Sequence, residues 1–165
     1  MINLHSKIFV AGHKGLVGSA VVRELKKKGY KNIITRDKKK LDLTNQTKVY
    51  SYLKKYKPKF IFICAAKVGG IQYNKNNKAD SITENLLIQT NLINGAFLAG
   101  IKNLIFLGSS CVYPKNCTQP IKEEFLMSGK LEETNDSYAI AKIAGIKMCQ
   151  SFNEQYKLNY RCLMP

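Results

Sequence analysis

The stretch that decides the fold runs from Lys7 to Leu25 and reads KIFVAGHKGLVGSAVVREL. Its first part is a run of β-branched and aromatic residues, typical of a buried strand, and its last part has apolar residues at helical spacing. Between them lies a loop with glycines three residues apart, Gly12, Gly15 and Gly18. Such glycines let backbone N–H groups approach a pyrophosphate at the positive end of the helix. The stretch therefore predicts a strand, loop and helix that bind a dinucleotide.

The residues after the next predicted strand, 32–35, indicate which nucleotide the fold takes. At this place a dinucleotide-binding fold carries either an acidic residue, which accepts a hydrogen bond from a ribose 2′-OH, or an arginine, which suits a 2′-phosphate. Arg36 stands here, and Lys14 lies across the glycine loop. These two cations favour NADP(H) over NAD(H), whereas Asp37 is the feature that favours NAD(H).

Strands and helices alternate along the rest of the chain. The further predicted strands are 59–66, 103–108 and 160–164, with a short one at 41–43. One predicted helix begins after the capping residues 44–47, a second spans 79–100, and a third runs from 138 to about 156. This alternation predicts an α/β fold, a doubly wound parallel sheet with right-handed crossovers, whose ligand crevice lies at the carboxyl ends of the strands. No repeat or linker divides the chain, so residues 1–165 are predicted to form one nucleotide-binding domain.

Small and nucleophilic side chains follow two of the predicted strands. Ala65 and Ala66 end one strand and leave space for a ligand. Ser109, Ser110 and Cys111 follow another, and such side chains at the carboxyl end of a parallel strand are typical of an active site. For this short segment alone, a serine-rich turn with a buried cysteine is the alternative.

The last predicted helix places Tyr138 and Lys142 four residues apart, and so on one helix face. A neighbouring cation lowers the pKa of a tyrosine, a combination that suits proton transfer to a ketone. In a chain with nine tyrosines and this many lysines, chance supplies such a pair, and Tyr50 with Lys54 is a second one. Only Tyr138 and Lys142 are predicted to lie at the crevice, which favours them as the functional pair.

Composition and cysteine pattern limit the class of protein. Hydrophobic residues make up 45% of the chain, as in an ordinary globular domain. The five cysteines are odd in number and scattered, without the spacing of a zinc or redox site, so we expect reduced thiols lying mostly in the core, and no metal site. No run has the length of a membrane span and no secretory signal opens the chain, so we expect a cytoplasmic protein with no membrane partner.

The net charge of +16 is concentrated at the start of the chain, where residues 1–60 hold 16 basic and three acidic residues. Only three of the basic residues in the whole chain are arginines, the type suited to bidentate phosphate or base contacts. Lysine clusters at 26–28, 38–40 and 54–55 are therefore interpreted as solvated faces, and a nucleic-acid partner is not expected. A non-specific polyanion-binding surface is the alternative.

With the glycine loop, Ser109-Ser110 and Tyr138-x-x-x-Lys142 in this order, the chain resembles the extended short-chain dehydrogenase/reductases that act on nucleotide sugars. The blocks 10–20, 65–71, 107–115 and 137–147 resemble one branch, the epimerase/reductases that convert GDP-4-keto-6-deoxy-D-mannose to GDP-L-fucose. The resemblance implies a Rossmann-like fold and NADP(H) as cofactor. It also implies epimerisation at C3 and C5, then reduction of the C4 ketone, and a homodimer formed through the helices at 79–100 and 138–157.

The resemblance implies a role for each candidate catalytic residue. Ser109 and Tyr138 would bind the C4 oxygen, and Tyr138 would protonate it. Lys142 would lower the phenol pKa and hold the nicotinamide ribose, while Cys111 would transfer a proton in the epimerisation. The candidate cofactor-binding residues are Gly12, His13, Lys14, Gly15, Leu16, Val17, Gly18, Arg36, Ala65, Ala66, Leu107, Gly108, Ser109, Ser110, Lys142 and Pro165.

The chain departs from this family in two respects. Lys14 stands where the family usually has arginine, which keeps the charge and loses the bidentate geometry. The family's chains are also about twice as long, and Pro165 falls where the substrate domain should begin. We therefore expect an incomplete copy, an NADP-binding domain without the substrate domain or the histidine that partners Cys111, with sheet surface left exposed. Another nucleotide-sugar epimerase/reductase, or a nucleotide-binding fragment without chemistry, is the alternative.

Overall fold

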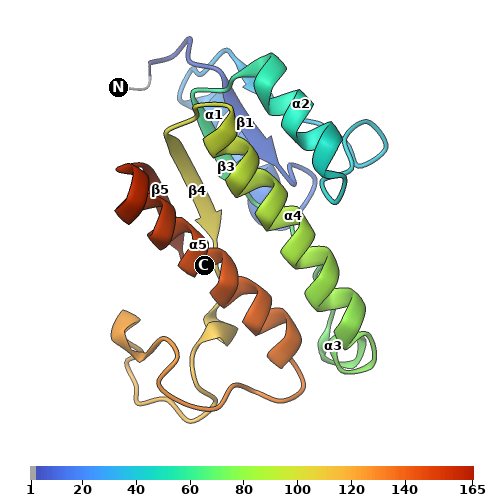
Figure 1. Ribbon diagram of the computed structural model, residues 1–165, viewed down its shortest axis with the longest axis vertical. Coiled ribbons are helices and arrows are strands. Elements are labelled where there is room, and N and C mark those ends of the chain that lie inside the picture. The colour runs from blue at the N-terminus through green and yellow to red at the C-terminus, as the bar shows by residue number, and fades with distance from the viewer. Residues whose placement is uncertain (1–2) are drawn as a thin grey trace.

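The computed structural model describes residues 3–165, which build a five-stranded parallel sheet (Figure 1). The strands are β1 (Ile8–Ala11), β2 (Ile33–Ile34), β3 (Phe60–Ile63), β4 (Asn103–Leu107) and β5 (Asn159–Leu163). They lie in the order β2-β1-β3-β4-β5, so the chain runs outward from β1 to β2 and returns to β3 on the other side of β1. The predicted doubly wound α/β fold is confirmed. Its crevice opens where the order reverses, between the carboxyl ends of β1 and β3.

Helices cover the two faces of the sheet unequally. They are α1 (Leu16–Lys27), α2 (Gln46–Tyr56), α3 (Ile71–Asn76), α4 (Lys78–Leu98) and α5 (Asp136–Tyr156), with 3₁₀ turns η1 (Ser110–Val112) and η2 (Glu123–Phe125). From β2 onward every crossover advances in one direction, and right-handed crossovers then place α2, α4 and α5 on the same face (Figure 1). The connection from β1 to β2 runs the other way, so α1 lies on the opposite face.

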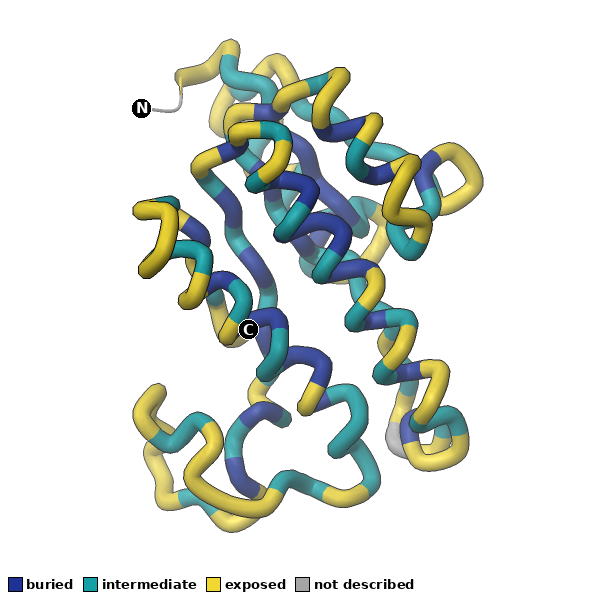
Figure 2. The backbone as a smooth tube through the Cα atoms, viewed as in Figure 1, coloured by how far each residue is buried: buried dark blue, intermediate teal, exposed yellow. Residues whose placement is uncertain are grey.

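Burial along the strands follows this asymmetry (Figure 2). Ile61 and Ile63 of β3, with Leu104 and Phe106 of β4, are at most 1% exposed beneath the helices. The alternate residues are half-buried, because only α1 reaches that face. A cavity of about 830 Å³ lies there, and its apolar lining includes Val17, Val21, Phe62, Ile105, Leu107 and Cys162.

Three local predictions need correction. The short strand predicted at 41–43 is wrong: the Asp42 carboxylate accepts hydrogen bonds from the backbone N–H and hydroxyl of Thr44, which folds this segment into a turn while Leu41 stays buried. The loop ends at Gly70, and the chain continues directly into α3, a helix that was not predicted. The last helix begins at Asp136 rather than at Tyr138.

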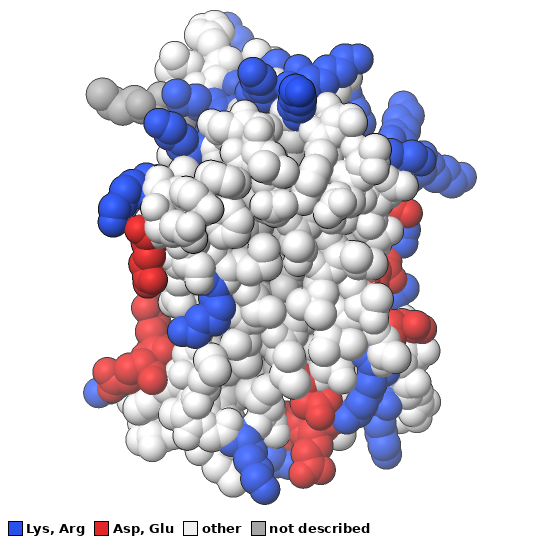
Figure 3. All heavy atoms as spheres, viewed as in Figure 1, with Lys and Arg blue, Asp and Glu red and all other residues white. Residues whose placement is uncertain are grey.

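The burial of the cysteines and the exposure of the lysines test two further predictions. All five cysteines are unpaired, but only Cys149 is fully buried and the other four are half-buried, so the expectation of mostly core thiols is wrong. The lysine clusters are exposed as expected. On the face drawn in Figure 3, Lys and Arg gather at the end of the molecule where the N-terminus and α2 lie. Within residues 3–165, no helix combines the length and apolarity needed to cross a membrane.

Candidate active site

The glycine loop packs directly on the chain that follows β3. Gly12 has φ +85°, and a Cβ built on it would lie 2.5 Å from the backbone nitrogen of Ala65. A Cβ on Gly18 would overlap the carbonyl of Gly12, while the N–H of Gly15 donates to that carbonyl at 3.0 Å. Gly15 is the N-cap of α1 and offers no side-chain cap. The first N–H groups of α1 are thus available to an anion at the switch point of the sheet.

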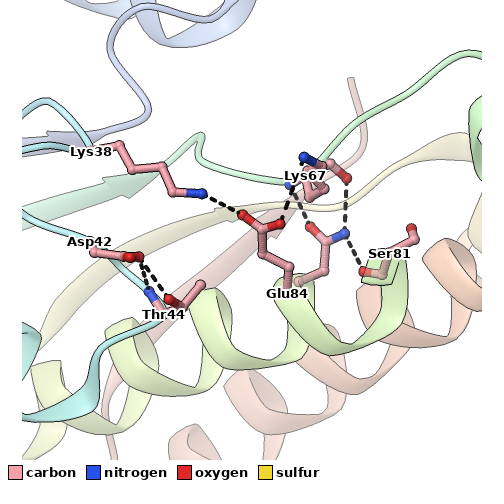
Figure 4. A network of polar contacts seen from close by, with 7 residues as sticks. Lys38, Asp42, Thr44, Lys67, Ser81 and Glu84 are labelled. Atoms are coloured by element: carbon pink, nitrogen blue, oxygen red, sulfur yellow. Dashed lines mark hydrogen bonds and ion pairs between the residues drawn. The ribbon is translucent and has the colours of Figure 1, made fainter. Parts of the chain in front are cut away.

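The backbone after β3 is held by a residue that the sequence reading missed. The Asn85 side chain accepts from the N–H of Lys67 at 2.9 Å and donates to the carbonyl of Lys67 at 2.9 Å and of Ser81 at 2.7 Å (Figure 4). Asn85 is 2% exposed, so these bonds are shielded from water. Asn85 is one of several buried polar residues of α4, with Ser81, Gln89 and Asn91, and nothing in the sequence distinguishes it from them. The effect of its hydrogen bonds is to fix the loop that carries Ala65 and Ala66 against α4.

A cavity of about 340 Å³ lies beside this loop, between α4 and the turn after β2. Leu41, Leu43 and Ile88 supply apolar lining and Asp42 a carboxylate, and none of these was predicted as a site residue. An ion pair at its rim joins Lys38 to Glu84, with Nζ and Oε1 at 2.8 Å (Figure 4). The hydrogen bond that Lys38 donates to Glu84 raises the pKa of Lys38. Apolar walls with a few polar groups suit a flat heteroaromatic base.

Arg36 borders this cavity and is held in place by tyrosines of α2. Its guanidinium lies 5.3 Å from the ring centre of Tyr52 and 5.2 Å from that of Tyr56, and it donates to the Thr35 carbonyl at 2.7 Å. The hydrogen bond with Tyr56 raises the pKa of Arg36, which therefore stays charged. The stack orients the guanidinium before any ligand is present.

Lys14 and Asp37 meet across the gap between the ends of β1 and β2. The Lys14 ammonium lies 2.9 Å from Asp37 Oδ1, and His13 Nε2 lies 3.3 Å from the same oxygen. The hydrogen bond from Lys14 holds the pKa of Asp37 below its ordinary value. The structure thus brings the two predicted cations, Lys14 and Arg36, to one place and adds a carboxylate between the glycine loop and the end of β2.

Ser109 and Cys111 lie at the carboxyl end of β4, as predicted. Ser109 is extended, and η1 begins at Ser110, so the chain turns sharply as it leaves the strand. The Cys111 thiol donates to Ser109 Oγ at 3.2 Å. Burial raises the pKa of Cys111, and the hydrogen bond with Ser109 and the charge of Lys142 oppose that rise. The thiol is therefore protonated near neutral pH.

Lys142 is a buried cation in the first turns of α5. It is 3% exposed, and its ammonium donates to the Leu107 carbonyl at 2.7 Å. The ammonium also lies 4.7 Å from the ring centre of Phe106 and 5.7 Å from that of Tyr138. Burial lowers the pKa of Lys142 to about 8. The sequence had predicted its position at the crevice, and the anchor on Leu107 comes from the tertiary structure.

The phenol of Tyr138 titrates in the direction opposite to that predicted. Burial is the main cause that raises its pKa to about 12, the neighbouring Cys111 acts in the same direction, and a hydrogen bond with Ser109 opposes the rise. The expectation that Lys142 lowers this pKa is wrong for this structure, because the ammonium is bonded to Leu107 and burial of the phenol dominates. Tyr138 is therefore a protonated donor near neutral pH.

Cys64 lies at the crevice, at the end of β3 beside Lys142. Burial raises the pKa of Cys64 to about 11, while the charge of Lys142 opposes the rise. Three predicted cofactor residues have their side chains elsewhere: Val17, Leu107 and Pro165 line the cavity on the α1 face of the sheet. Leu16, the first residue of α1, is 90% exposed. Contacts from these four residues to a nucleotide in the crevice would be made by their backbone.

The arrangement combines an anion site with a proton-donating cluster. The first turn of α1 and the cations at Lys14 and Arg36 suit a phosphorylated nucleotide, and the adjacent cavity suits its base. Ser109, Tyr138 and Cys111 gather two hydroxyls and a thiol in one small space beside a buried ammonium. Such a cluster can stabilise and protonate an oxygen on which negative charge develops.

The chain is similar in sequence to several proteins that are named GDP-sugar synthases. The chain is 52% identical to the GDP-L-fucose synthase of Sinorhizobium fredii over 96% of its length, and 52% identical to GDP-L-fucose synthase 1 of Arabidopsis thaliana over 94%. Among solved structures, a GDP-D-glycero-L-gluco-heptose synthase from Campylobacter jejuni in the presence of NADPH is 42% identical, with a TM-score of 0.96 over 99% of the chain. The chain covers 50%, 48% and 48% of these three proteins, so it spans about half the length of the relatives it matches.

A model of a wider protein family also matches the chain. The model describes the NAD dependent epimerase/dehydratase family and matches residues 8–165. The match begins at the first residue of β1 and so takes in every strand and helix that builds the crevice. The chain therefore belongs to the NAD dependent epimerase/dehydratase family.

Proposed function

We propose that the chain is the NADP(H)-binding, reductive part of an epimerase/reductase that converts GDP-4-keto-6-deoxy-D-mannose to GDP-L-fucose. The observation that carries the proposal is the cluster of Ser109, Tyr138 and Lys142 at the carboxyl end of β4, next to a glycine loop flanked by Lys14 and Arg36. About 50% identity to two GDP-L-fucose synthases supports the substrate. In this proposal, residues 1–165 are one NADP-binding domain.

Each residue of the cluster has a role in this reaction. Ser109 and Tyr138 hydrogen-bond the C4 oxygen of the sugar, which stabilises the enolate formed when a proton leaves C3 or C5. NADPH supplies the hydride for C4. Tyr138 then protonates the oxygen, and its raised pKa keeps it in the donor form until negative charge develops. Lys142, anchored on Leu107, adds positive charge beside the phenol and is in place to hold the nicotinamide ribose.

The cofactor assignment is tested by calorimetric titration of the chain with NADPH and NADH. We expect clearly tighter binding of NADPH, and a preference that weakens in Arg36→Ala because a guanidinium near the 2′-phosphate is lost. Equal affinities of the unsubstituted chain for the two nucleotides would contradict the assignment. Tight NADPH binding by a full-length version that does not turn over the keto sugar would instead favour a nucleotide-binding module without chemistry.

Cys111 is proposed to transfer a proton during epimerisation, because its protonated thiol lies against Ser109 in the same cluster. In a full-length version, Cys111→Ser should slow deuterium incorporation at C3 and C5 in heavy water more than it slows hydride transfer. Unchanged exchange would remove Cys111 from the mechanism. The likeness to a heptose synthase favours a GDP-heptose as a second candidate substrate, so both GDP-sugars should be offered.

A homodimer through α4 and α5 is also proposed. Both helices carry exposed large apolar side chains, namely Leu87, Leu98, Ile140 and Tyr156. Exposed apolar groups on two adjacent helices suit association with a second copy. Light scattering should give twice the mass of the chain, and a monomer at all concentrations would contradict the proposal.

A further inference from the structure

Two cysteines outside the active site face each other between α5 and β5. The strands β4 and β5 are parallel, so α5, which connects them, runs in the opposite direction to β5. Asn153 of α5 fixes how the two elements are aligned. Its amide donates to the Tyr160 carbonyl at 2.7 Å, and its oxygen accepts from the Tyr160 N–H at 2.8 Å.

This alignment places Cys149 opposite Cys162. Cys149 lies four residues before Asn153, which is about 6 Å back along the helix. Cys162 lies two residues after Tyr160, which is about 7 Å forward along the strand, and on the same face of the strand as Tyr160. Because the helix and the strand run in opposite directions, the two steps lead to the same place.

The two thiols are in contact but differ in exposure. The Cys149 thiol donates a hydrogen bond to the Cys162 sulfur, which raises the pKa of Cys149 and lowers that of Cys162. Cys149 is fully buried. Cys162 is half-buried and lines the cavity of about 830 Å³, which reaches round the edge of β5 to Gln150 of α5. A reagent in this cavity therefore meets Cys162 first.

We propose that Cys149 and Cys162 form a thiol-oxidation site, at which glutathione disulfide converts the pair to an intramolecular disulfide. The Cys162 thiolate attacks one sulfur of glutathione disulfide and forms a mixed disulfide, and the released glutathione thiolate takes up the proton that Cys162 lost. Cys149 then attacks the Cys162 sulfur, and its proton passes to the second glutathione as that thiolate leaves. The pair loses two protons and two electrons, and glutathione disulfide takes up both.

The cross-link ties an edge strand to the helix that carries the candidate catalytic residues. Within residues 3–165, β5 pairs with β4 alone, and the Leu163 carbonyl accepts from the Gly108 N–H at 2.8 Å where the two strands end. A disulfide between α5 and β5 closes a short loop around the turn at Lys157 and restricts the unfolded chain. The oxidised chain should therefore unfold at a higher urea concentration than the reduced chain.

The test exposes the reduced, folded chain to glutathione disulfide and analyses it by mass spectrometry without reduction. Trypsin cleaves after Lys157 and Arg161 and so separates the two cysteines. The expected product is peptide 148–157 joined to peptide 162–165, with the loss of two hydrogen atoms. Dithiothreitol should release the two peptides and return the urea midpoint to that of the reduced chain.

Three variants test the order of the steps. Cys149→Ala should stop the reaction at the mixed disulfide, with one glutathione retained on Cys162. Cys162→Ala should leave Cys149 unmodified, because that thiol is fully buried. Cys117→Ala is the matched control, since it removes a half-buried thiol from the loop before α5 and should form the same cross-link. Circular dichroism checks the fold of each variant.

Three results would overturn this inference, which does not depend on the proposed function. They are a cross-link that forms only in urea, a different cysteine joined to Cys162, and glutathione on Cys149 in Cys162→Ala at the rate seen for Cys162. If a variant does not fold, the unsubstituted chain decides, because the joined peptides either form in the folded chain or do not.

Discussion

Two tyrosine–lysine pairs with the same four-residue spacing occur in this molecule, and the structure gives them different surroundings. Lys142 is 3% exposed and donates to the carbonyl of Leu107, whereas Lys54 is exposed on the outer side of α2. The Tyr138 phenol lies among Ser109 and Cys111, and its pKa is raised to about 12.

The hydroxyl of Tyr50 instead accepts hydrogen bonds from the amides of Gln46 and Asn94. Its ring packs on Gly95 of α4. The four-residue spacing by itself therefore does not give a pair a catalytic role. What gives one pair a chemical role is its place at the carboxyl end of β4, where the chain that leaves this strand supplies a hydroxyl and a thiol as partners.

The largest expected difference between the pairs is catalytic. In a full-length version, Tyr138→Phe should lower the rate of NADPH-dependent ketone reduction by about 10²- to 10⁴-fold, because the proton donor is lost. Tyr50→Phe removes the same hydroxyl from the other pair and should leave the rate within about twofold. The rate is followed by NADPH absorbance. A comparable loss in both variants would show that the hydroxyls act through folding rather than chemistry.

The second difference concerns stability as a function of pH. Burial lowers the pKa of Lys142 from 10.5 to about 8, so between these values the unfolded chain binds more protons than the folded protein. Stability contributed by this residue therefore rises with pH across that window, by up to about 3 kcal/mol. Urea unfolding at pH 7.5 and pH 10 should show this rise in the unsubstituted chain relative to Lys142→Met.

Lys54→Met is the matched control for that experiment. Its side chain is exposed, so the variant should follow the unsubstituted chain at both pH values. The comparison between variants removes from the pH dependence of stability the contributions of the cysteines and tyrosines that titrate in the same range. A stability difference between Lys142→Met and the unsubstituted chain that is the same at both pH values would contradict the burial of a charged Lys142.

The smallest expected difference lies in the glycines that let each pair pack. A Cβ on Gly145 would lie 2.5 Å from the ring of Phe106, which is 1% exposed and supports Lys142. Gly145→Ala should therefore lower the free energy of unfolding by about 1–3 kcal/mol. A Cβ on Gly95 would lie 2.9 Å from the ring of Tyr50, which is half-buried and can move. Gly95→Ala should cost less because this ring can move, whereas the gain of about 1 kcal/mol from alanine in a helix is common to both variants. Equal urea midpoints for the two variants would contradict this ranking.

Much of the site was predictable because it follows strands. Strong apolar runs before Gly12, Ala65 and Ser109 predicted three buried strands, and in a parallel sheet their carboxyl ends must meet. The turn at 41–43 was not predictable, because alternating leucines fit both a strand and a turn that buries Leu41 and half-buries Leu43. Asn85 and Glu84 were missed because a polar residue on a helix has no partner until another segment packs against it.

The sequence by itself determined the order of strands and helices, the glycine loop, and which residue types reach the crevice, since these depend on local periodicity and on the rule that parallel strands end at one edge. Only the tertiary structure decided the protonation chemistry. Whether Lys142 faces Tyr138 or the Leu107 carbonyl, and whether Asp37 is held by Lys14, depends on burial and on distances between segments far apart in the chain. Burial and pairing shift each pKa away from the ordinary value of its residue type, and neither is known before the chain is folded.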